Sequence, residues 1–355
     1  MQPDPQFTTV DWSRASVNWQ AWWEGELPRP LVWIEVYPTL PDIGLPSTDP
    51  FLTEYPLDLP AGEILDALAP WLTQVHYLGD AVPKVWPNFG AGIVAGFLGA
   101  PVEYRTHTTW FGTVETATLA DLRPEFDPVN VWWQRAQEFT RIAAQRWENF
   151  IIGHTDLGGN LDILASLRGT QTLLTDLYDS PEEVERLVAE ITVLWLRYYN
   201  ELSALLGKEK RGYSCWAPIW APEPCYMLQS DFAYMISPKM FERFVLLDLE
   251  TCCAHLNYGF YHLDGKGQIR HLDMLLTLKR LRGIQWIPGD GAPPPEEWLP
   301  LLKRIRDGGK LCQLFVTRAG ALKISRELGG KGFLFCIEEA LTLEEAEEFL
   351  ATFKI

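Results

Sequence analysis

Hydrophobic residues follow two alternating spacings along the chain. Some apolar residues form short continuous runs of strand length, and others recur three and four positions apart, as in helices with one buried face. The strand-like runs lie at 31–37, 149–154, 211–215, 311–316 and 332–336, and two more end at Asp264 and Trp286. Each run is therefore predicted to be a strand.

The segments between these runs have helical spacing. In 61–78 a single apolar stripe is formed by Ile64, Leu65, Leu68, Trp71, Leu72 and Val75. The other predicted helices lie at 12–24, 128–148, 237–257, 296–307, 319–328 and 342–353. The long segment 161–206 is predicted to hold two helices, because Ser180 and Pro181 form a cap and a first turn in its middle.

About eight strands thus alternate with helices, the second of them in the proline- and glycine-rich region 82–110. Such alternation favours a parallel α/β sheet. The length of 355 residues fits one barrel with insertions. We therefore predict a single (β/α)8 TIM barrel over 31–355, preceded by a Trp-rich N-terminal extension over 1–30 that caps one barrel end.

Composition limits the partners and the compartment. The net charge of −17 repels phosphate backbones and anionic membrane surfaces, so neither nucleic acid nor a membrane is expected as a partner. The longest small-apolar segment, 91–100, is too short to cross a bilayer. The first residues lack the basic and apolar segments of a secretory signal, and the six cysteines include no CxxC pair. These features predict a cytoplasmic protein.

Candidate chemistry gathers in the strand–helix–strand stretch 259–291. His262 and Asp264 are two positions apart at the end of a strand, so their side chains share a face. Parallel α/β folds build their active sites at the carboxyl ends of strands. Cys336 ends the last strand, across the same opening. Together the three residues predict a site for zinc, or another divalent metal, with one position open to substrate.

Other polar or aromatic residues lie at or beyond predicted strand ends. We interpret Asp156 and Asp231 as candidate catalytic acids. The candidate contacts to a small-molecule substrate are Asn88, Trp110, Asn160, Trp216, Ser230, Gln285 and Trp286. A capping or packing role is the alternative for each of them.

Five segments carry a resemblance to a known family. They are RPLVW at 29–33, LRGTQTLLTDLYDSPEEVERLV at 167–188, SDFAYMISPKMFERF at 230–244, YHLDG at 261–265 and FCIEEALTLEEAEEFL at 335–350. With these segments the chain resembles the uroporphyrinogen decarboxylase superfamily over most of its length. The resemblance implies a (β/α)8 barrel that is either a decarboxylase or a cobalamin-dependent methyltransferase.

Two positions argue against true uroporphyrinogen decarboxylation. The decarboxylases of this superfamily hold the carboxylates of their substrate with two arginines. The matching positions here are Val36 and Leu40. Without these cations, a substrate with many carboxylates would lose its charge-assisted anchors.

The metal residues match the methyltransferase branch more closely. That branch carries a zinc-binding cysteine six residues before the threonine that opens the last helix, as Cys336 does before Thr342. Its His-x-Cys pair is matched by His262 and Asp264, so hard oxygen replaces soft sulfur at one ligand. The resemblance implies a zinc-dependent methyltransferase that moves a methyl group between cobalamin on a corrinoid protein and a thiol or other small acceptor.

Two alternatives remain open. In the first alternative the chain is a cofactor-free decarboxylase or lyase of a small carboxylic acid, in which Asp156, Asp231 or Asp264 protonates a carbanion-like carbon. The basic residues that would hold the substrate carboxylate in such a lyase are Arg168, Lys266 and Arg270. Otherwise it is a non-catalytic subunit that binds a corrinoid or a partner protein. The sequence also leaves a homodimer open.

Overall fold

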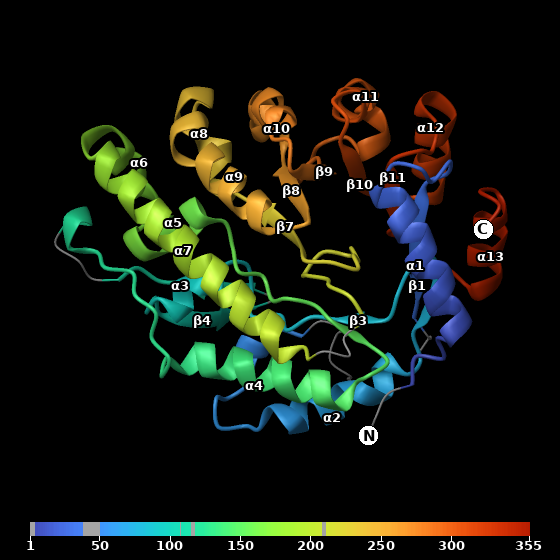
Figure 1. Cartoon of the computed structure of the whole chain (residues 1–355), viewed down its shortest axis with the longest axis horizontal. Helices are drawn as coiled ribbons and strands as arrows, with labels where there is room; N and C mark the ends of the chain where they lie inside the picture. The colour runs from blue at the N-terminus through green and yellow to red at the C-terminus, as the bar shows by residue number, and fades with distance from the viewer. Residues whose placement is uncertain (1–3, 38–49, 107, 115–117, 208–210) are drawn as a thin grey trace.

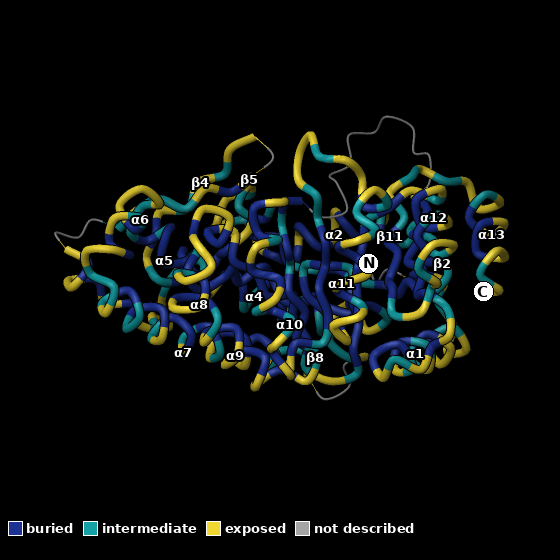
Figure 2. Tube along the Cα trace, turned by 90° about the horizontal axis from the view of Figure 1, so that it is seen from above, coloured by how far each residue is buried: buried dark blue, intermediate teal, exposed yellow. Residues whose placement is uncertain are grey.

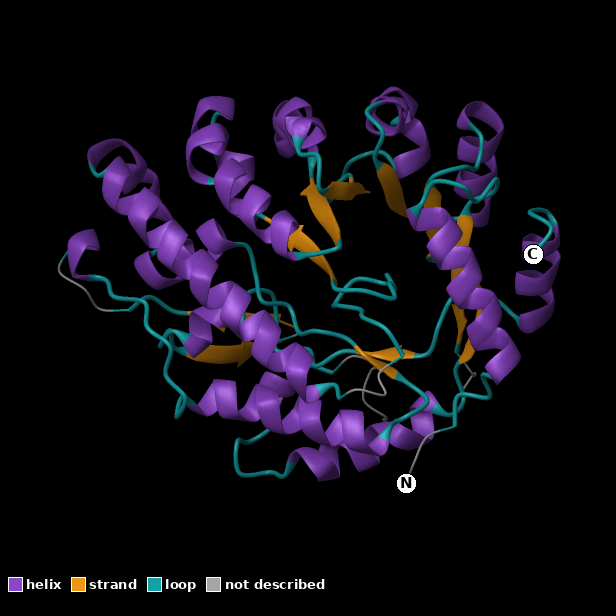
Figure 3. Cartoon of the chain, viewed as in Figure 1, coloured by secondary structure: helices purple, strands orange, loops and turns teal. Residues whose placement is uncertain are grey.

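The computed structural model describes residues 4–37, 50–106, 108–114, 118–207 and 211–355. They form a mixed α/β structure in which helices lie around the outside of the strands (Figures 1 and 3). The α-helices are α1 (Thr9–Trp23), α2 (Ala61–Leu72), α3 (Val94–Phe97), α4 (Val131–Arg146), α5 (Asn160–Arg168), α6 (Thr170–Asp179), α7 (Pro181–Leu205), α8 (Pro238–Phe244), α9 (Leu246–His255), α10 (Leu272–Thr277), α11 (Leu299–Asp307), α12 (Arg318–Leu328) and α13 (Leu343–Ala351). Short 3₁₀ helices are η1 (Leu52–Glu54), η2 (Leu119–Asp121), η3 (Asp231–Met235), η4 (Lys266–His271) and η5 (Pro295–Glu297).

The strands form one large sheet and two small ones. They are β1 (Leu31–Val36), β2 (His76–Gly79), β3 (Lys84–Val85), β4 (Val102–Arg105), β5 (Thr108–Phe111), β6 (Ile151–Ile152), β7 (Cys225–Gln229), β8 (Tyr258–Asp264), β9 (Leu281–Ile287), β10 (Leu311–Val316) and β11 (Phe333–Ile337). The large sheet has the order β2-β1-β11-β10-β9-β8-β7, and only the pair of β1 and β2 is antiparallel. A parallel pair, β3-β6, and an antiparallel pair, β4-β5, stand apart. The predicted α/β class with a mostly parallel sheet is therefore confirmed.

The parallel strands are covered on both faces. Every position of β7 is buried, and so are all but one of β10. Strands of this kind have nearly continuous apolar runs instead of a polar alternation. Figure 2 shows the buried positions concentrated inside the molecule and the exposed ones along its outer turns.

Among the described residues the strands do not close into a barrel. The predicted strand 211–215 is wrong, because this region has only one isolated bridge, between Tyr213 and Ala221. The free edge of β1 is taken by the antiparallel β2. The segment 213–221 instead turns inward, and its main-chain carbonyls accept hydrogen bonds from interior side chains.

The predicted helix 61–78 is wrong at its end, because α2 stops at Leu72 and 76–78 belong to strand β2. The other helix predictions hold for type and differ in number. The segment 161–206, predicted as two helices, contains α5, α6 and α7. Gly169 separates α5 from α6 with a φ of +91°, a left-handed conformation that favours glycine. The predicted break before Pro181 is confirmed, although the Ser180 side chain makes no capping hydrogen bond.

Helix α1 lies against the amino-terminal ends of strands. The Trp22 Nε1 donates to the carbonyl of Phe333, the first residue of β11, at 3.1 Å. The ring of Trp23 lies 4.5 Å from that of Tyr258, the first residue of β8. This buried aromatic cluster leaves the carboxyl ends of the strands for a site. Among the described helices, none combines the length and the apolar character needed to cross a membrane.

Candidate functional site

Two neighbouring strands bring three metal-binding side chains together at their carboxyl ends. Asp231 follows β7 by two residues, and His262 and Asp264 end β8, which pairs with β7. One ligand atom from each of these residues lies within 4.8 Å of the others. We call this set the Asp–His–Asp group. Gly265, with a φ of +74°, turns the chain away directly after it.

The position of Asp231 is set by a buried carboxylate on α5. Asp162 accepts the backbone N–H groups of Asp231 at 2.9 Å and of Phe232 at 2.7 Å. These bonds fix the start of η3, so that the Asp231 side chain stays beside β8. Asp162 was not singled out in the sequence, although an acidic residue in the first turn of a predicted helix is a signal for such a role.

Negative charge is concentrated here. Asp156 is buried, and its Oδ1 accepts from the Gly158 N–H at 2.9 Å and from the Gln229 amide at 3.4 Å. Burial, and then the charge of Asp231, raise the pKa of Asp156 to about 7. Desolvation also raises the pKa of Asp231, whereas the nearby His262 lowers it. A cation bound between these carboxylates would relieve their repulsion.

A row of polar side chains crosses the interior of the sheet at the level of His262. Strand register places Gln229, His262, Gln285 and Gln313 side by side on β7, β8, β9 and β10. The three glutamines are buried. Polar residues within otherwise apolar strands are the sequence signal for this row, and Gln313 was missed although it interrupts the apolar run of β10.

The hydrogen bonds of this row determine the tautomer of His262. The Gln313 amide nitrogen donates to the Pro218 carbonyl at 2.8 Å, so its oxygen must accept from the Gln285 amide nitrogen, at 3.1 Å. The Gln285 oxygen then faces the His262 Nδ1, which must carry the proton. The Nε2 of His262 is left with its lone pair, as a metal ligand or a base requires.

We expect neutral His262 to be the Nδ1–H tautomer in solution. In Gln285→Leu the acceptor is lost, and the ring should shift towards the Nε2–H form that predominates in free imidazoles. Nitrogen-15 NMR of histidine-labelled protein measures this directly. The exposed Gln171→Leu should leave the His262 signals unchanged. Wild-type protein with the proton on Nε2 would contradict the assignment.

Cys336 is not part of the Asp–His–Asp group. Its Sγ accepts from the Gln313 amide at 3.4 Å, so two glutamines separate it from His262 along the hydrogen-bonded row. Burial raises the pKa of the Cys336 thiol to about 12. The structure therefore combines the predicted ligands His262 and Asp264 with Asp231 in place of the cysteine.

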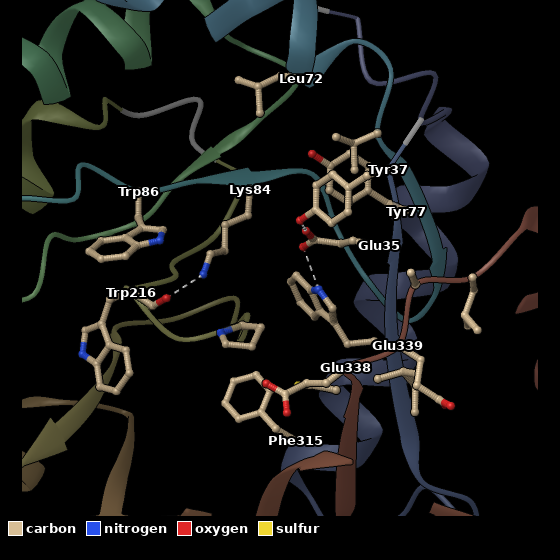
Figure 4. Close-up of a pocket in the computed structure, with 17 residues that line it drawn as sticks. Glu35, Tyr37, Leu72, Tyr77, Lys84, Trp86, Trp216, Phe315, Glu338 and Glu339 are labelled. Carbon is tan, nitrogen blue, oxygen red and sulfur yellow. Dashed lines mark hydrogen bonds between the residues drawn. The ribbon is translucent and has the colours of Figure 1, made fainter. Parts of the chain in front are cut away.

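A cavity of about 580 Å³ lies beside this group, at the ends of β1, β10 and β11 (Figure 4). We call it the aromatic cavity. Its lining is Trp33, Glu35, Tyr37, Leu72, Val75, Tyr77, Lys84, Trp86, Trp216, Pro218, Phe315, Cys336, Ile337, Glu338, Glu339, Ala340 and Leu341. Trp216 connects the aromatic cavity with the Asp–His–Asp group, because its ring packs edge to face against the His262 ring, with 5.3 Å between the ring centroids. Of the predicted substrate contacts, Trp216 lies in this lining.

Gln285 and Trp286 face opposite sides of β9. Gln285 belongs to the interior row, as described above. Trp286 is completely buried on the other side, 5.2 Å from the ring of Trp298. Its packing is therefore that of a core residue, away from the aromatic cavity.

The remaining predicted contacts also lie outside the cavity lining. The Asn88 side chain accepts from the Gly90 N–H at 3.0 Å, and Asn160 donates to Thr192 at 2.9 Å, so both support local structure. Trp110 is 57% exposed on β5. The Ser230 hydroxyl is buried and has no hydrogen-bond partner among the described residues.

The basic residues proposed for a lyase differ in their surroundings. Arg168 forms an ion pair with Asp176 at 2.7 Å, and Arg270 donates to the Gly267 carbonyl at 2.7 Å. Lys266 lines a smaller hollow of about 210 Å³ together with Asp264. Of the three, Lys266 is thus the one that shares a hollow with a residue of the Asp–His–Asp group.

Comparison with known proteins adds no assignment. The chain matches no protein-family model, and no curated protein is significantly similar to it. Val36, one of the two positions matched in the sequence to a substrate-binding arginine of the decarboxylases, is buried in β1. Leu40, the other position, lies outside the described residues.

Proposed function

We propose that the protein is a metal-dependent methyltransferase of the uroporphyrinogen decarboxylase-like type. It would move a methyl group between a corrinoid protein and a thiol or other small acceptor. The observation that supports this proposal best is the convergence of Asp231, His262 and Asp264 within 4.8 Å at two strand ends. The resemblance in sequence supports the choice of methyl transfer.

The same proposal includes a barrel architecture. We infer a (β/α)8 barrel that is open beside β1 and between β6 and β7. Six parallel strands in consecutive order, from β7 to β11 and on to β1, support this inference. The parallel pair of β3 and β6 would bring the number of barrel strands to eight.

The residues of the Asp–His–Asp group suit a divalent ion. Two carboxylates and one neutral imidazole provide hard and borderline donors, which favour manganese, iron, magnesium or zinc over metals that need thiolate. Burial, and then the charge of Asp264, raise the pKa of Asp231, so a bound cation would stabilise the ionised form of this carboxylate. A bound divalent ion would supply a Lewis acid that favours the anionic form of an acceptor.

The chain's own side chains would orient and shield the reacting groups. Gln285 holds the His262 ring with Nε2 free. Trp216 packs on the edge of this ring and excludes water from one side. The aromatic cavity, on the other side of Trp216, would hold the small molecule that exchanges a methyl group with the corrinoid.

Metal binding tests the proposal. Wild-type protein should bind about one divalent ion per chain. Loss of a residue that only orients a ligand costs 10–100-fold in metal affinity, so His262→Ala and Asp264→Asn should each weaken binding by at least about 100-fold. Isothermal titration with manganese and zinc, followed by elemental analysis, measures both.

Matched controls separate ligand loss from general charge loss. His255→Ala and Asp58→Asn remove an exposed histidine and an exposed aspartate outside the group, and both should bind metal like the wild type. Equal affinity in all four variants, or no binding by the wild type, would rule out the metal centre. Methyl transfer from methylcobalamin to a thiol by the metal-loaded protein would distinguish the enzyme from a non-catalytic subunit.

A cofactor-free lyase is the second candidate, and one observation favours it. Asp156 is buried and has a pKa of about 7, which suits a general acid at neutral pH. In that case activity on a small carboxylic acid would survive a chelator and disappear in Asp156→Asn. Activity that requires added metal would exclude this candidate.

A further inference from the structure

Six aromatic side chains line the aromatic cavity. They come from segments far apart in the sequence and surround a common space (Figure 4). The six are Trp33, Tyr37, Tyr77, Trp86, Trp216 and Phe315. Aromatic faces carry negative electrostatic potential, so a cavity with this wall attracts a cation from which water has been removed.

Two carboxylates in the cavity form no ion pair with a cation in the part of the chain that the structure describes. Glu35 accepts from the Trp33 Nε1 at 2.8 Å and from the Tyr37 hydroxyl, and both donors are neutral. The side chain of Glu338 has neither a hydrogen bond nor an ion pair among the described residues, and burial raises its pKa. Glu35 is half-buried and Glu338 is exposed at the cavity rim, and neither has a positive partner among the described residues.

The other two charged residues of the lining are held by their own partners. Glu339 forms an ion pair with Arg318 at 3.4 Å. The Lys84 ammonium donates to the carbonyls of Trp216 at 3.1 Å and Ala217 at 2.7 Å, which fix it against one wall. Glu35 and Glu338 carry two negative charges and Lys84 carries one positive charge, so the aromatic cavity has an excess of negative charge.

We propose that the aromatic cavity binds a small organic cation, an ammonium compound that carries N-methyl groups. The aromatic rings would surround the methyl groups, and Glu35 and Glu338 would balance the charge. The volume of about 580 Å³ accommodates a small molecule of this kind. Inorganic cations suit this wall poorly, because they need oxygen ligands on several sides.

This proposal names a substrate class for the proposed function. It rests on the proposed function only for the methyl-transfer reaction, because binding of the ammonium compound requires no metal. Trp216 lines the cavity and also contacts His262 at 5.3 Å. A bound ammonium compound would thus place its methyl groups next to the Asp–His–Asp group. The substrate would then be an N-methylated ammonium ion. One of its C–N bonds would break, the methyl group would pass to the corrinoid, and the amine would leave with the electron pair of that bond.

Choline and its neutral isostere 3,3-dimethylbutan-1-ol test the proposal, because they share a shape and differ in charge. Isothermal titration of the metal-free wild type should show choline binding at least about 10-fold more tightly than the alcohol. Glu338→Gln and Glu35→Gln should each weaken choline binding by about 10-fold, as should Trp86→Ala. Glu347→Gln, exposed on α13, is the matched control and should bind choline like the wild type.

The outcomes separate this inference from the proposed function. Choline binding without metal binding would support the cavity assignment and rule out the proposed metal centre. Metal binding with no choline binding, or with equal affinity for choline and the alcohol, overturns the cavity assignment alone. Preferential binding of acetate would also overturn it, since Lys84 would then be the recognition group. The comparison of two ligands on the wild type does not depend on whether the variants fold.

Discussion

Replacing Asp80 by alanine is expected to destabilise the protein by about 3–5 kcal/mol, because it breaks a buried ion pair. Asp80 is completely buried. Its carboxylate accepts from both terminal nitrogens of Arg29, at 2.7 and 3.0 Å, and from the Val32 N–H at 3.0 Å. It also accepts from the Asn18 amide at 2.8 Å. The substitution leaves the Arg29 guanidinium and the Val32 N–H without this acceptor.

Urea unfolding measures this loss, with the exposed Asp58→Ala as the control that should change stability by less than about 0.5 kcal/mol. The double variant with Arg29→Ala should lose less than the sum of the single variants, since the two groups share one interaction. Additive losses, or a loss below about 1 kcal/mol in Asp80→Ala, would contradict the role assigned to the pair. Arg29 opens the RPLVW segment, so this segment has a structural role in the fold.

The second large effect is on the pH dependence of stability. Asp156 has a pKa of about 7 in the folded protein, against 3.8 in an unfolded chain. Between these values the folded state binds the additional proton, so stability falls as pH rises. The loss is about 1.4 kcal/mol for each pH unit, or roughly 4 kcal/mol in total. Above about pH 7 the contribution of Asp156 levels off.

Asp156→Asn removes this titration. Urea unfolding of both proteins between pH 5 and pH 8 should show the wild type losing about 2–3 kcal/mol relative to the variant, mostly below pH 7. Acids remote from Asp156 titrate alike in both proteins and cancel in the comparison, so the difference reports Asp156 and the acids it interacts with, Asp231 and Asp162. Parallel curves would show that Asp156 is already ionised at pH 5.

Strands and helices with a clear period were predictable. The run 311–316 is β10, and 319–328 differs from α12 by one residue, because their apolar positions follow one spacing without interruption. The strand β7 was missed, since its apolar run lies directly after a proline-rich stretch and looked like part of a loop. The strand predicted at 211–215 was wrong for a related reason. These residues precede the same proline-rich stretch, and the chain there turns inward with only one isolated bridge.

The site was predictable where one strand determines it. His262 and Asp264 share a face because side chains on a strand alternate with period two. The same rule separates Gln285 from Trp286, which were both predicted to contact substrate although neighbours on a strand face opposite sides. Which strand ends meet depends on the order of strands in the sheet, so the sequence alone did not predict that Asp231, and not Cys336, lies beside His262 and Asp264.

The carbonyl groups of 216–218 have an evolutionary consequence. They bind Lys84 and Gln313 through the main chain, so most side-chain replacements at these three positions would leave the acceptors in place. An insertion or deletion of one residue would displace all of them together. Relatives that keep this interior arrangement should therefore vary in composition across the segment and agree in its length.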